Sequence, residues 1–277
     1  MNINKFFKIL LILFLFCTTC NANESEGNKM TKEEICKENF NKLFLLDPLG
    51  KNGTDPEFMA ILQKYIFGEV FTIGELDIKT RELVTITVLG TMQTLPQLNA
   101  HINAALNVGV TPIEIREAMY QLAPFIGFPK SLNAINTMNE VFEKRGVKLP
   151  LEDTTTTKDN ERYKKGFEIQ NPIYGDEIKQ SLKNLPNNVG DDVSRFLTEV
   201  CFGDFYTRGG LDIKTRELLT IAILTATGNK ETLKAHIKGN IKVGNNKETI
   251  AAVIVQSMPY TGFPNAIMAL KTLKEAK

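Results

Sequence analysis

The chain has 277 residues, of which 33 are Lys or Arg and 32 are Asp or Glu, for a formal net charge of +1 at pH 7. This near balance gives no electrostatic reason to expect binding to nucleic acid or to an anionic membrane surface. The length suits two domains of roughly 120 residues, each large enough to bury a core.

Residues 1–22 predict a signal peptide. Two lysines precede the apolar run Ile9–Phe16, which is too short to span a bilayer, and polar residues follow it. The small residues Cys20 and Ala22 suit cleavage after position 22. We therefore expect an exported protein, periplasmic or secreted. Acylation of Cys20, which would make the protein a lipoprotein, and an uncleaved anchor helix are the alternatives; otherwise we expect no membrane attachment.

Residues 30–150 form the first predicted domain, and its patterns are mostly helical. Leu83–Val88 alternates as a strand would, but the charged lead-in Asp77–Glu82 suits the first turn of a helix. We expect a central helix that is apolar nearly all round. Thr94 opens a capping-box pattern for the next helix, and Gly109 stands where that helix should end.

Two further helices should complete this domain. Thr111 and Glu114 form a capping box with Pro112 at the first helical position. Gly127-Phe128-Pro129 then breaks the chain and starts another helix. The first domain is therefore predicted to be an all-α bundle.

The sequence repeats itself once along its length. The octapeptide Leu76–Leu83 recurs unchanged at Leu211–Leu218. The number of residues from one copy to the other, called here the octapeptide offset, then holds without a gap for about fifty more positions. A period this long indicates a duplicated domain, because solenoid repeats run roughly 20–50 residues. We expect a second all-α domain at 161–277, after an exposed linker at 151–160 that contains four consecutive threonines.

The candidate catalytic residues also occur twice. The chain has two histidines, His101 and His236, and each lies nineteen residues after a glutamate, Glu82 or Glu217. Two antiparallel helices joined by a short turn would bring each pair into contact. Such a contact fixes the imidazole tautomer and supports proton transfer. A buried hydrogen bond that only ties two helices together is the alternative.

Other residue types narrow the chemistry. Arg81 and Arg216 repeat beside the glutamates and are candidates for binding a substrate carboxylate, or for surface ion pairs. Two histidines spread over two domains do not supply three metal ligands, and no Gly-rich phosphate loop is present, so we expect no metal and no cofactor. Cys36, which a constant offset aligns with Asn171, and Cys201 form either one disulfide or two separate thiols.

Taken together, the repeated octapeptide, the Ala-His-Ile nineteen residues after its glutamate, the helix-ending glycine and the Gly-Phe-Pro turn resemble the carboxymuconolactone decarboxylase family. The resemblance covers both copies. It implies helical bundles that act on a small-molecule substrate. It also implies a homo-oligomer, which for tandem chains would be a trimer.

One branch of that superfamily, the alkylhydroperoxidase D-like proteins, uses a Cys-x-x-Cys between its glutamate and its histidine. None of the four matching positions here is a thiol: they are Thr94, Gln97, Asn229 and Thr232. A thiol peroxidase needs a thiolate to attack the peroxide. This activity is therefore disfavoured, unless Cys36 or Cys201 is reactive.

The other branch is a decarboxylase without a cofactor. By resemblance, the two histidines would donate protons, the two glutamates would set their state, and the two arginines would orient a carboxylate. The leading prediction is lyase or isomerase chemistry on a small carboxylated or lactone-like substrate. The alternative is an exported protein that binds a small acid without turning it over.

Overall fold

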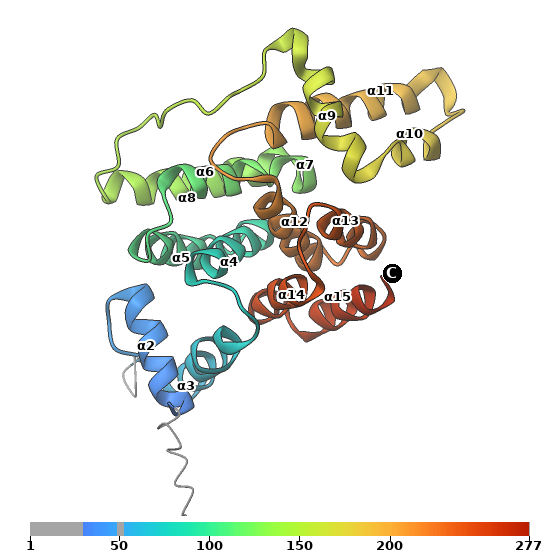
Figure 1. The fold of residues 1–277 in the computed structure, drawn as a ribbon. Coiled ribbons are helices and arrows are strands. Elements are labelled where there is room, and N and C mark those ends of the chain that lie inside the picture. The colour runs from blue at the N-terminus through green and yellow to red at the C-terminus, as the bar shows by residue number, and fades with distance from the viewer. Residues whose placement is uncertain (1–29, 49–52, 277) are drawn as a thin grey trace, which may run out of the picture. The chain divides into compact units, whose positions relative to one another are not determined.

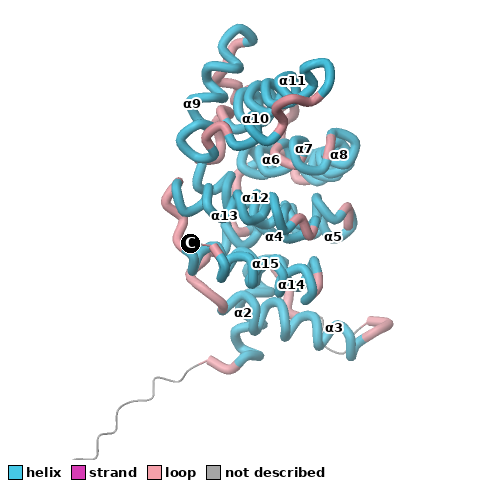
Figure 2. Tube along the Cα trace, turned by 90° about the vertical axis from the view of Figure 1, so that its right-hand side faces the viewer, coloured by secondary structure: helices cyan, strands magenta, loops and turns pink. Residues whose placement is uncertain are grey.

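A computed structural model describes residues 30–48 and 53–276 of the protein. The predicted signal peptide, with Cys20, lies outside these residues. The described chain is built from helices and contains no strand, which confirms the all-α fold class (Figure 2). Residues Lys32–Lys277 form one compact unit. In this described part, no helix has the length and apolar character needed to cross a membrane.

The first half, within the described residues, contains seven α-helices with a π-helix and a 3₁₀-helix among them (Figure 1). In chain order they are α2 (Lys32–Phe44), α3 (Pro56–Gln63), the π-helix η1 (Lys64–Glu69), the 3₁₀-helix η2 (Val70–Thr72), α4 (Ile78–Met92), α5 (Leu95–Asn107), α6 (Pro112–Tyr120), α7 (Ala123–Ile126) and α8 (Phe128–Lys144).

The second half follows the same plan. Its elements are η3 (Asp159–Glu161), α9 (Arg162–Tyr174), α10 (Glu177–Ser181), η4 (Pro186–Asn188), α11 (Val189–Phe196), the π-helix η5 (Leu197–Tyr206), α12 (Ile213–Thr227), α13 (Lys230–Lys242), α14 (Lys247–Thr261) and α15 (Phe263–Glu275). Helix α14 is continuous where the first half has α6 and α7.

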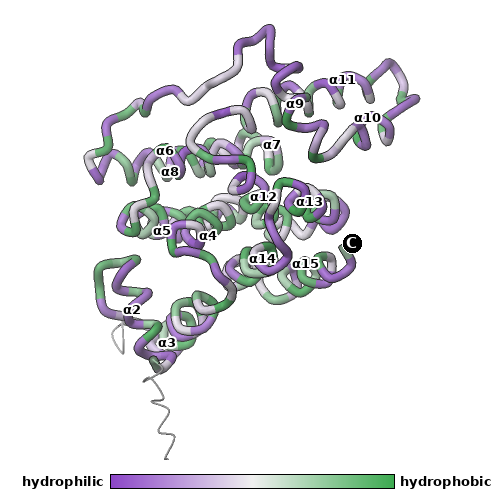
Figure 3. Tube along the Cα trace, in the orientation of Figure 1, coloured by the Kyte–Doolittle hydropathy of each residue, from purple (hydrophilic) through white to green (hydrophobic). Residues whose placement is uncertain are grey.

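Helices α4 and α12 form the centre of the core. They pack against each other, and α4 also packs against α14 of the second half (Figure 1). Both are largely apolar, as Figure 3 shows. The threonines that made α4 alternate like a strand are buried, and Thr85, Thr87 and Thr91 each donate to the carbonyl four residues earlier. Because these hydroxyls are satisfied inside the helix, they do not oppose its burial.

The helix ends follow most of the expected signals. The Thr111 capping box is present with both of its hydrogen bonds, and Gly109 adopts a positive φ of 85° at the end of α5. The capping box expected at Thr94 is wrong. Thr94 precedes α5, but its hydroxyl makes no cap hydrogen bond and instead lies 3.4 Å from the carbonyl oxygen of Leu89.

The offset between the two halves changes ahead of the π-helices. The carbonyl of Lys32 lies against Gly68 as the carbonyl of Arg162 lies against Gly203. Gly68 and Gly203 match at the octapeptide offset, whereas Lys32 and Arg162 match at an offset that is smaller by five. Helices α2 and α9 therefore follow this shorter offset. Cys36 corresponds to Gly166, and the alignment of Cys36 with Asn171 is corrected.

The shorter offset makes the last residues of the two helices equivalent. Phe44 ends α2, and Tyr174 ends α9. The contacts of the preceding residues, Leu43 and Ile173, confirm the match. Asn107 at the end of α5 donates to the carbonyl of Leu43, and Lys242, the equivalent residue at the end of α13, donates to the carbonyl of Ile173. Phe44 and Tyr174 therefore occupy the same place in their halves.

The segment 151–160 is extended and mostly exposed, and Figure 1 shows it passing from α8 to α9. It is nevertheless bonded to the second half. The carbonyl of Thr154 accepts from the backbone of Gly209 at 3.0 Å, and the hydroxyl of Thr156 donates to the carbonyl of Thr207 at 2.6 Å. The linker is thus held along its length.

Candidate functional site

The first Glu–His pair lies between the central helix and the next one. Glu82, in the first turns of α4, is fully buried, and its Oε2 lies 2.9 Å from Nδ1 of His101 on α5. The other oxygen, Oε1, is buried without a hydrogen-bond partner among the described residues. The sequence spacing therefore brings this carboxylate and this imidazole together.

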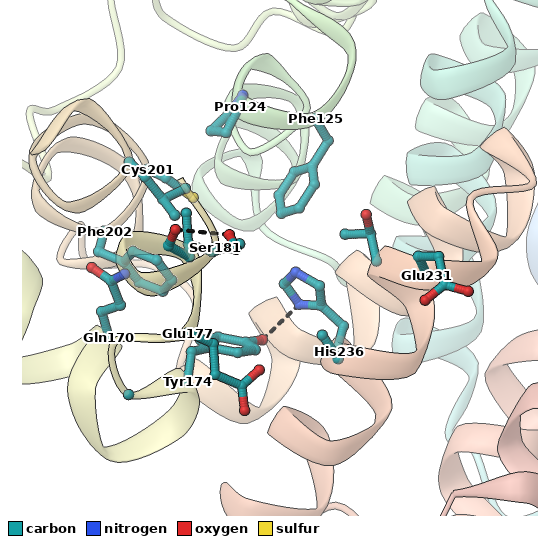
Figure 4. Close-up of a pocket in the computed structure, with 15 residues that line it drawn as sticks. Pro124, Phe125, Gln170, Tyr174, Glu177, Ser181, Cys201, Phe202, Glu231 and His236 are labelled. Carbon is teal, nitrogen blue, oxygen red and sulfur yellow. Dashed lines mark hydrogen bonds between the residues drawn. The ribbon is translucent and has the colours of Figure 1, made fainter. Parts of the chain in front are cut away.

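The second pair contains a tyrosine as well. Oε2 of Glu217 on α12 is 3.3 Å from Nδ1 of His236 on α13. The hydroxyl of Tyr174 donates to that carboxylate oxygen at 2.5 Å and lies 2.6 Å from the same imidazole nitrogen (Figure 4). Tyr174 therefore bridges the carboxylate and the imidazole. As in the first site, the second oxygen of Glu217 finds no hydrogen-bond partner in the part of the chain that the structure describes.

Each histidine is flanked by one aromatic ring from each half of the chain. The rings are Phe44 (5.6 Å between centroids) and Tyr260 (5.7 Å) around His101, and Tyr174 (4.9 Å) and Phe125 (5.7 Å) around His236. Tyr260 belongs to the second half and Phe125 to the first. Neither site is therefore complete within its own half.

A cavity of about 580 Å³ opens at the second site. Its walls come from α7, α9, α10, η5 and α13, and His236 and Phe125 face it (Figure 4). The lining is mainly apolar. It includes the acidic residues Glu177 and Glu231 and, among the residues the structure describes, no lysine or arginine. This volume suits a small organic molecule.

Burial controls the ionisable groups around this cavity. It raises the pKa of Tyr174 far above its usual range, and the neighbouring Glu217 carboxylate raises it further, so the phenol keeps its proton. Burial, with Glu217 again adding to it, raises the pKa of Cys201 to about 12. Cys201 lines the cavity as a thiol and not as a thiolate.

The two cysteines within the described residues are free and buried. Burial and the nearby Glu33 raise the pKa of the Cys36 thiol too. A protonated, buried thiol is a poor nucleophile. Neither Cys36 nor Cys201 has the environment of a peroxidatic residue.

The arginines lie apart from the cavity. Arg81 is buried, donates to the carbonyls of Ile73 and Gly74, and reaches Gln256 of the other half at 3.0 Å. Burial lowers its pKa to about 10. Neither Arg81 nor Arg216 is among the residues that line the cavity, so the structure does not bring them together with the Glu–His pair there.

Arg216 makes the equivalent contacts in the opposite direction. It donates to Gln121 of the first half, at 3.3 Å, and also to Glu117 at 3.1 Å. Gln121 and Gln256 themselves match at the octapeptide offset, and each also donates to a threonine of the facing central helix. The arginines therefore form matched connections between the two halves.

Sequence reasoning missed the aromatic residues of both sites. Phe125 and Tyr260 align at the octapeptide offset, so a repeated aromatic position was a usable signal. Tyr174 gave no such signal, because the shorter offset applies to its helix and the matching residue is Phe44.

Comparison with known proteins agrees with this architecture. The sequence model of the carboxymuconolactone decarboxylase family matches residues 56–140 and 191–275, together more than half of the chain. The chain is similar to 4-carboxymuconolactone decarboxylase of Acinetobacter baylyi, with 31% identity over 118 residues, which is 42% of this chain and 87% of that protein.

Two further relatives are similar to part of the chain. Nitrosuccinic acid decarboxylase of Metarhizium robertsii is 29% identical over 130 residues, 45% of this chain and 87% of that protein. An uncharacterised 15.0 kDa protein of Paracoccus denitrificans is 36% identical over 90 residues, 31% of this chain and 66% of that protein. With two matches to the family model and two Glu–His pairs in matching places, the chain belongs to the carboxymuconolactone decarboxylase family as a tandem member.

Proposed function

We propose that the protein is a decarboxylase-like lyase that works without a cofactor, on a small acid in which the electrons left by CO₂ can be delocalised. The observation that carries the proposal is the second site, where a buried carboxylate supports an imidazole that faces a mainly apolar cavity. Two relatives that are decarboxylases by name support the reaction class.

The chemistry asks for two things at this site. When the bond between carbon and the carboxylate breaks, CO₂ leaves. The electron pair of the broken bond stays on the substrate, delocalised towards a carbonyl or similar group. His236, protonated, then returns a proton from Nε2 to carbon, and solvent reprotonates the imidazole. Glu217, whose Oε2 lies 3.3 Å from Nδ1, holds the imidazole ring in place during that transfer.

We assign the arginines a structural part in this proposal. Arg81 and Arg216 donate to backbone carbonyls and to residues of the opposite half. Their contacts support a role in joining the halves in place of the carboxylate binding expected from the sequence. A substrate carboxylate would then be held by the protonated imidazole itself.

The test is turnover of defined acids. Purified protein is mixed with 4-carboxymuconolactone and, separately, with nitrosuccinic acid, and CO₂ release is measured. The double variant His101→Ala/His236→Ala should lose at least about 10²-fold in rate, the typical contribution of a positioned acid or base. Tyr163→Phe, an exposed position on α9, serves as the control.

Three outcomes separate the hypotheses. Turnover that is lost in the double variant supports the proposal. Turnover that survives in it would move the chemistry away from the histidines. Binding of either acid by calorimetry without release of CO₂ would overturn the lyase proposal and support an acid-binding protein.

A further inference from the structure

The two sites share a Glu–His pair but differ in the residues behind it. Four positions change from apolar or methyl-bearing residues in the first half to polar residues or glycine in the second. The pairs are Phe44 and Tyr174, Ala104 and Gly239, Ala105 and Asn240, and Val110 and Asn245. All four changes lie around Glu217, so together they give the second site a more polar environment than the first.

Gly239 makes room for the tyrosine hydroxyl. A Cβ atom at position 239 would lie 2.6 Å from Oη of Tyr174 and 2.9 Å from its Cε1, closer than real Cβ contacts allow. The first half carries a methyl group at this place, Ala104, and its aromatic ring, Phe44, has no hydroxyl. The second site therefore has both the hydroxyl and the glycine, and the first site has neither.

Two asparagines form a series of hydrogen bonds to Glu217, and Nδ2 of Asn240 lies 3.5 Å from the Glu217 carboxylate oxygen Oε2. Nδ2 of Asn240 donates to the backbone carbonyl of Glu217 at 3.0 Å, and Nδ2 of Asn245 donates to Oδ1 of Asn240 at 2.9 Å. Both asparagines are buried. Buried polar groups that satisfy one another fix the geometry of the group they hold.

The number of hydrogens that each group can donate determines which atom is the donor in each hydrogen bond of the second site. A phenol has one hydrogen to donate, and Tyr174 donates it to Oε2 of Glu217. The 2.6 Å contact between Oη and Nδ1 of His236 then requires the hydrogen on the imidazole nitrogen. The resulting order is Nδ1–H to Tyr174 and Tyr174 O–H to Glu217. In the first site Nδ1 of His101 donates straight to Glu82.

We propose that Tyr174 is a positioning residue of the second site, which couples Glu217 to His236 and keeps the hydrogen on Nδ1 so that Nε2 is the proton-transfer atom facing the cavity. The first site lacks this relay: its carboxylate and imidazole meet directly at 2.9 Å, whereas in the second site their direct distance is 3.3 Å and the Tyr174 hydroxyl bridges them. The part of this statement that concerns proton transfer to substrate rests on the proposed function. The part that concerns hydrogen bonding does not.

The hydrogen-bonding part is tested without substrate by ¹⁵N and ¹H NMR of protein labelled in histidine. The chain has two histidines, so single His→Gln variants assign both sets of ring signals. We expect both neutral imidazoles as Nδ1–H tautomers, with different Nδ1–H proton shifts because one hydrogen bonds to a carboxylate and the other to a phenol. Tyr174→Phe should move the His236 signals and leave those of His101 in place.

Matched variants guard against a general loss of structure. Tyr163→Phe removes an exposed hydroxyl from the same helix, α9, and should move neither histidine. Gly239→Ala should move the His236 signals without touching the hydroxyl group itself. Phe44→Tyr with Ala104→Gly should give His101 the shift pattern of His236. His236 signals unchanged in both Tyr174→Phe and Gly239→Ala, or an Nε2–H tautomer in the unaltered protein, would overturn the proposal.

Turnover provides the second readout. If the protein decarboxylates either test acid, Tyr174→Phe in a His101→Ala background, where turnover depends on the second site, should lower kcat on the order of 10²-fold while KM changes little, because a misplaced proton donor affects the transition state. An unchanged kcat with altered NMR signals would remove the positioning role. Absence of turnover in the unaltered protein would sink the proposed function and leave the hydrogen-bonding result standing.

Discussion

Cys201 faces the cavity beside Tyr174, yet its surroundings suppress thiol chemistry. Burial raises its pKa to about 12, so the reactive thiolate is scarce at neutral pH. The residue is thus a small apolar wall of the cavity. Its place within a substrate-sized space still makes it a sensitive reporter of opening.

We expect iodoacetamide at pH 8 to leave Cys201 unmodified in the folded protein. Cys36, also buried and with a raised pKa, should behave in the same way. Both should react fully once the protein is unfolded in guanidinium. Peptide mass spectrometry distinguishes the two sites, and rapid labelling of native Cys201, or its oxidation by stoichiometric peroxide, would revive the peroxidase hypothesis.

Residue types alone predicted the Glu–His contacts but not the phenol that bridges one of them. The pairs were visible because both members recur at one offset. Tyr174 was invisible for the opposite reason: its helix is shifted by five positions relative to the repeat, and its counterpart is a phenylalanine. The repeat of the arginines could be seen in the sequence. Their contacts could not, because they depend on burial, and a sequence does not show that a charged residue is buried.

At the scale of the helices, caps and apolar patterns located most boundaries. The central helix α4 was predicted in spite of its strand-like alternation, because its charged lead-in Asp77–Glu82 suits a helix N-terminus. Asp77 and Asp212 do cap α4 and α12. The offset change at α2 and α9 was not predictable, since these helices share little sequence and are placed by their packing on the π-helices and on α5 and α13.

The two threonines that precede helices provide a matched test of capping. Thr111→Ala removes a side-chain cap of α6 and should lower the free energy of unfolding by about 1 kcal/mol. Thr94→Ala removes a hydroxyl that makes no cap hydrogen bond and should cost clearly less. Urea unfolding followed by circular dichroism measures both. Equal losses would show that the cap geometry at α6 contributes little.

At the scale of the whole chain, Glu117 joins the halves and the linker. Its carboxylate accepts from Arg116, Arg208 and Arg216 and from the hydroxyl of Thr154. The equivalent position in the second half is Ala252, so this cluster has no counterpart there. Removing the carboxylate would leave Arg216 buried without a counter-charge, a situation that typically costs about 3–5 kcal/mol.

Glu117→Gln should therefore destabilise the protein by that amount at pH 7. Burial alone would raise the pKa of Glu117, but the hydrogen bond and charge of Arg208, with Thr154 and Arg216, outweigh it and hold the pKa below its usual value. The carboxylate's contribution is thus full above the unfolded pKa, about 4.3, and is lost as the pH falls through the lower folded value.

Urea unfolding of both proteins between pH 7 and pH 3 checks this dependence. The difference in free energy should stay constant down to about pH 5 and shrink at lower pH. Glu140→Gln, at an exposed position on α8, is the control and should change little. A difference that grows on acidification would contradict the assigned sign.

Self-association is predicted by the family resemblance and has support in repeated exposed apolar residues. Phe128 on α8 and Phe263 on α15 match at the octapeptide offset and are 60% and 56% exposed. Phe128→Glu with Phe263→Glu should lower the mass measured by light scattering, while Tyr163→Glu should not. A monomeric mass for the unaltered protein would exclude the oligomer.

The covalent linker has a consequence for what the protein can become. Two identical chains that met through these faces would carry every substitution twice, once in each site. Joined in one polypeptide, the halves are free to differ, and they do: one site keeps Phe44 with Ala104, and the other has Tyr174 with Gly239. Fusion therefore allows each half to change without its twin.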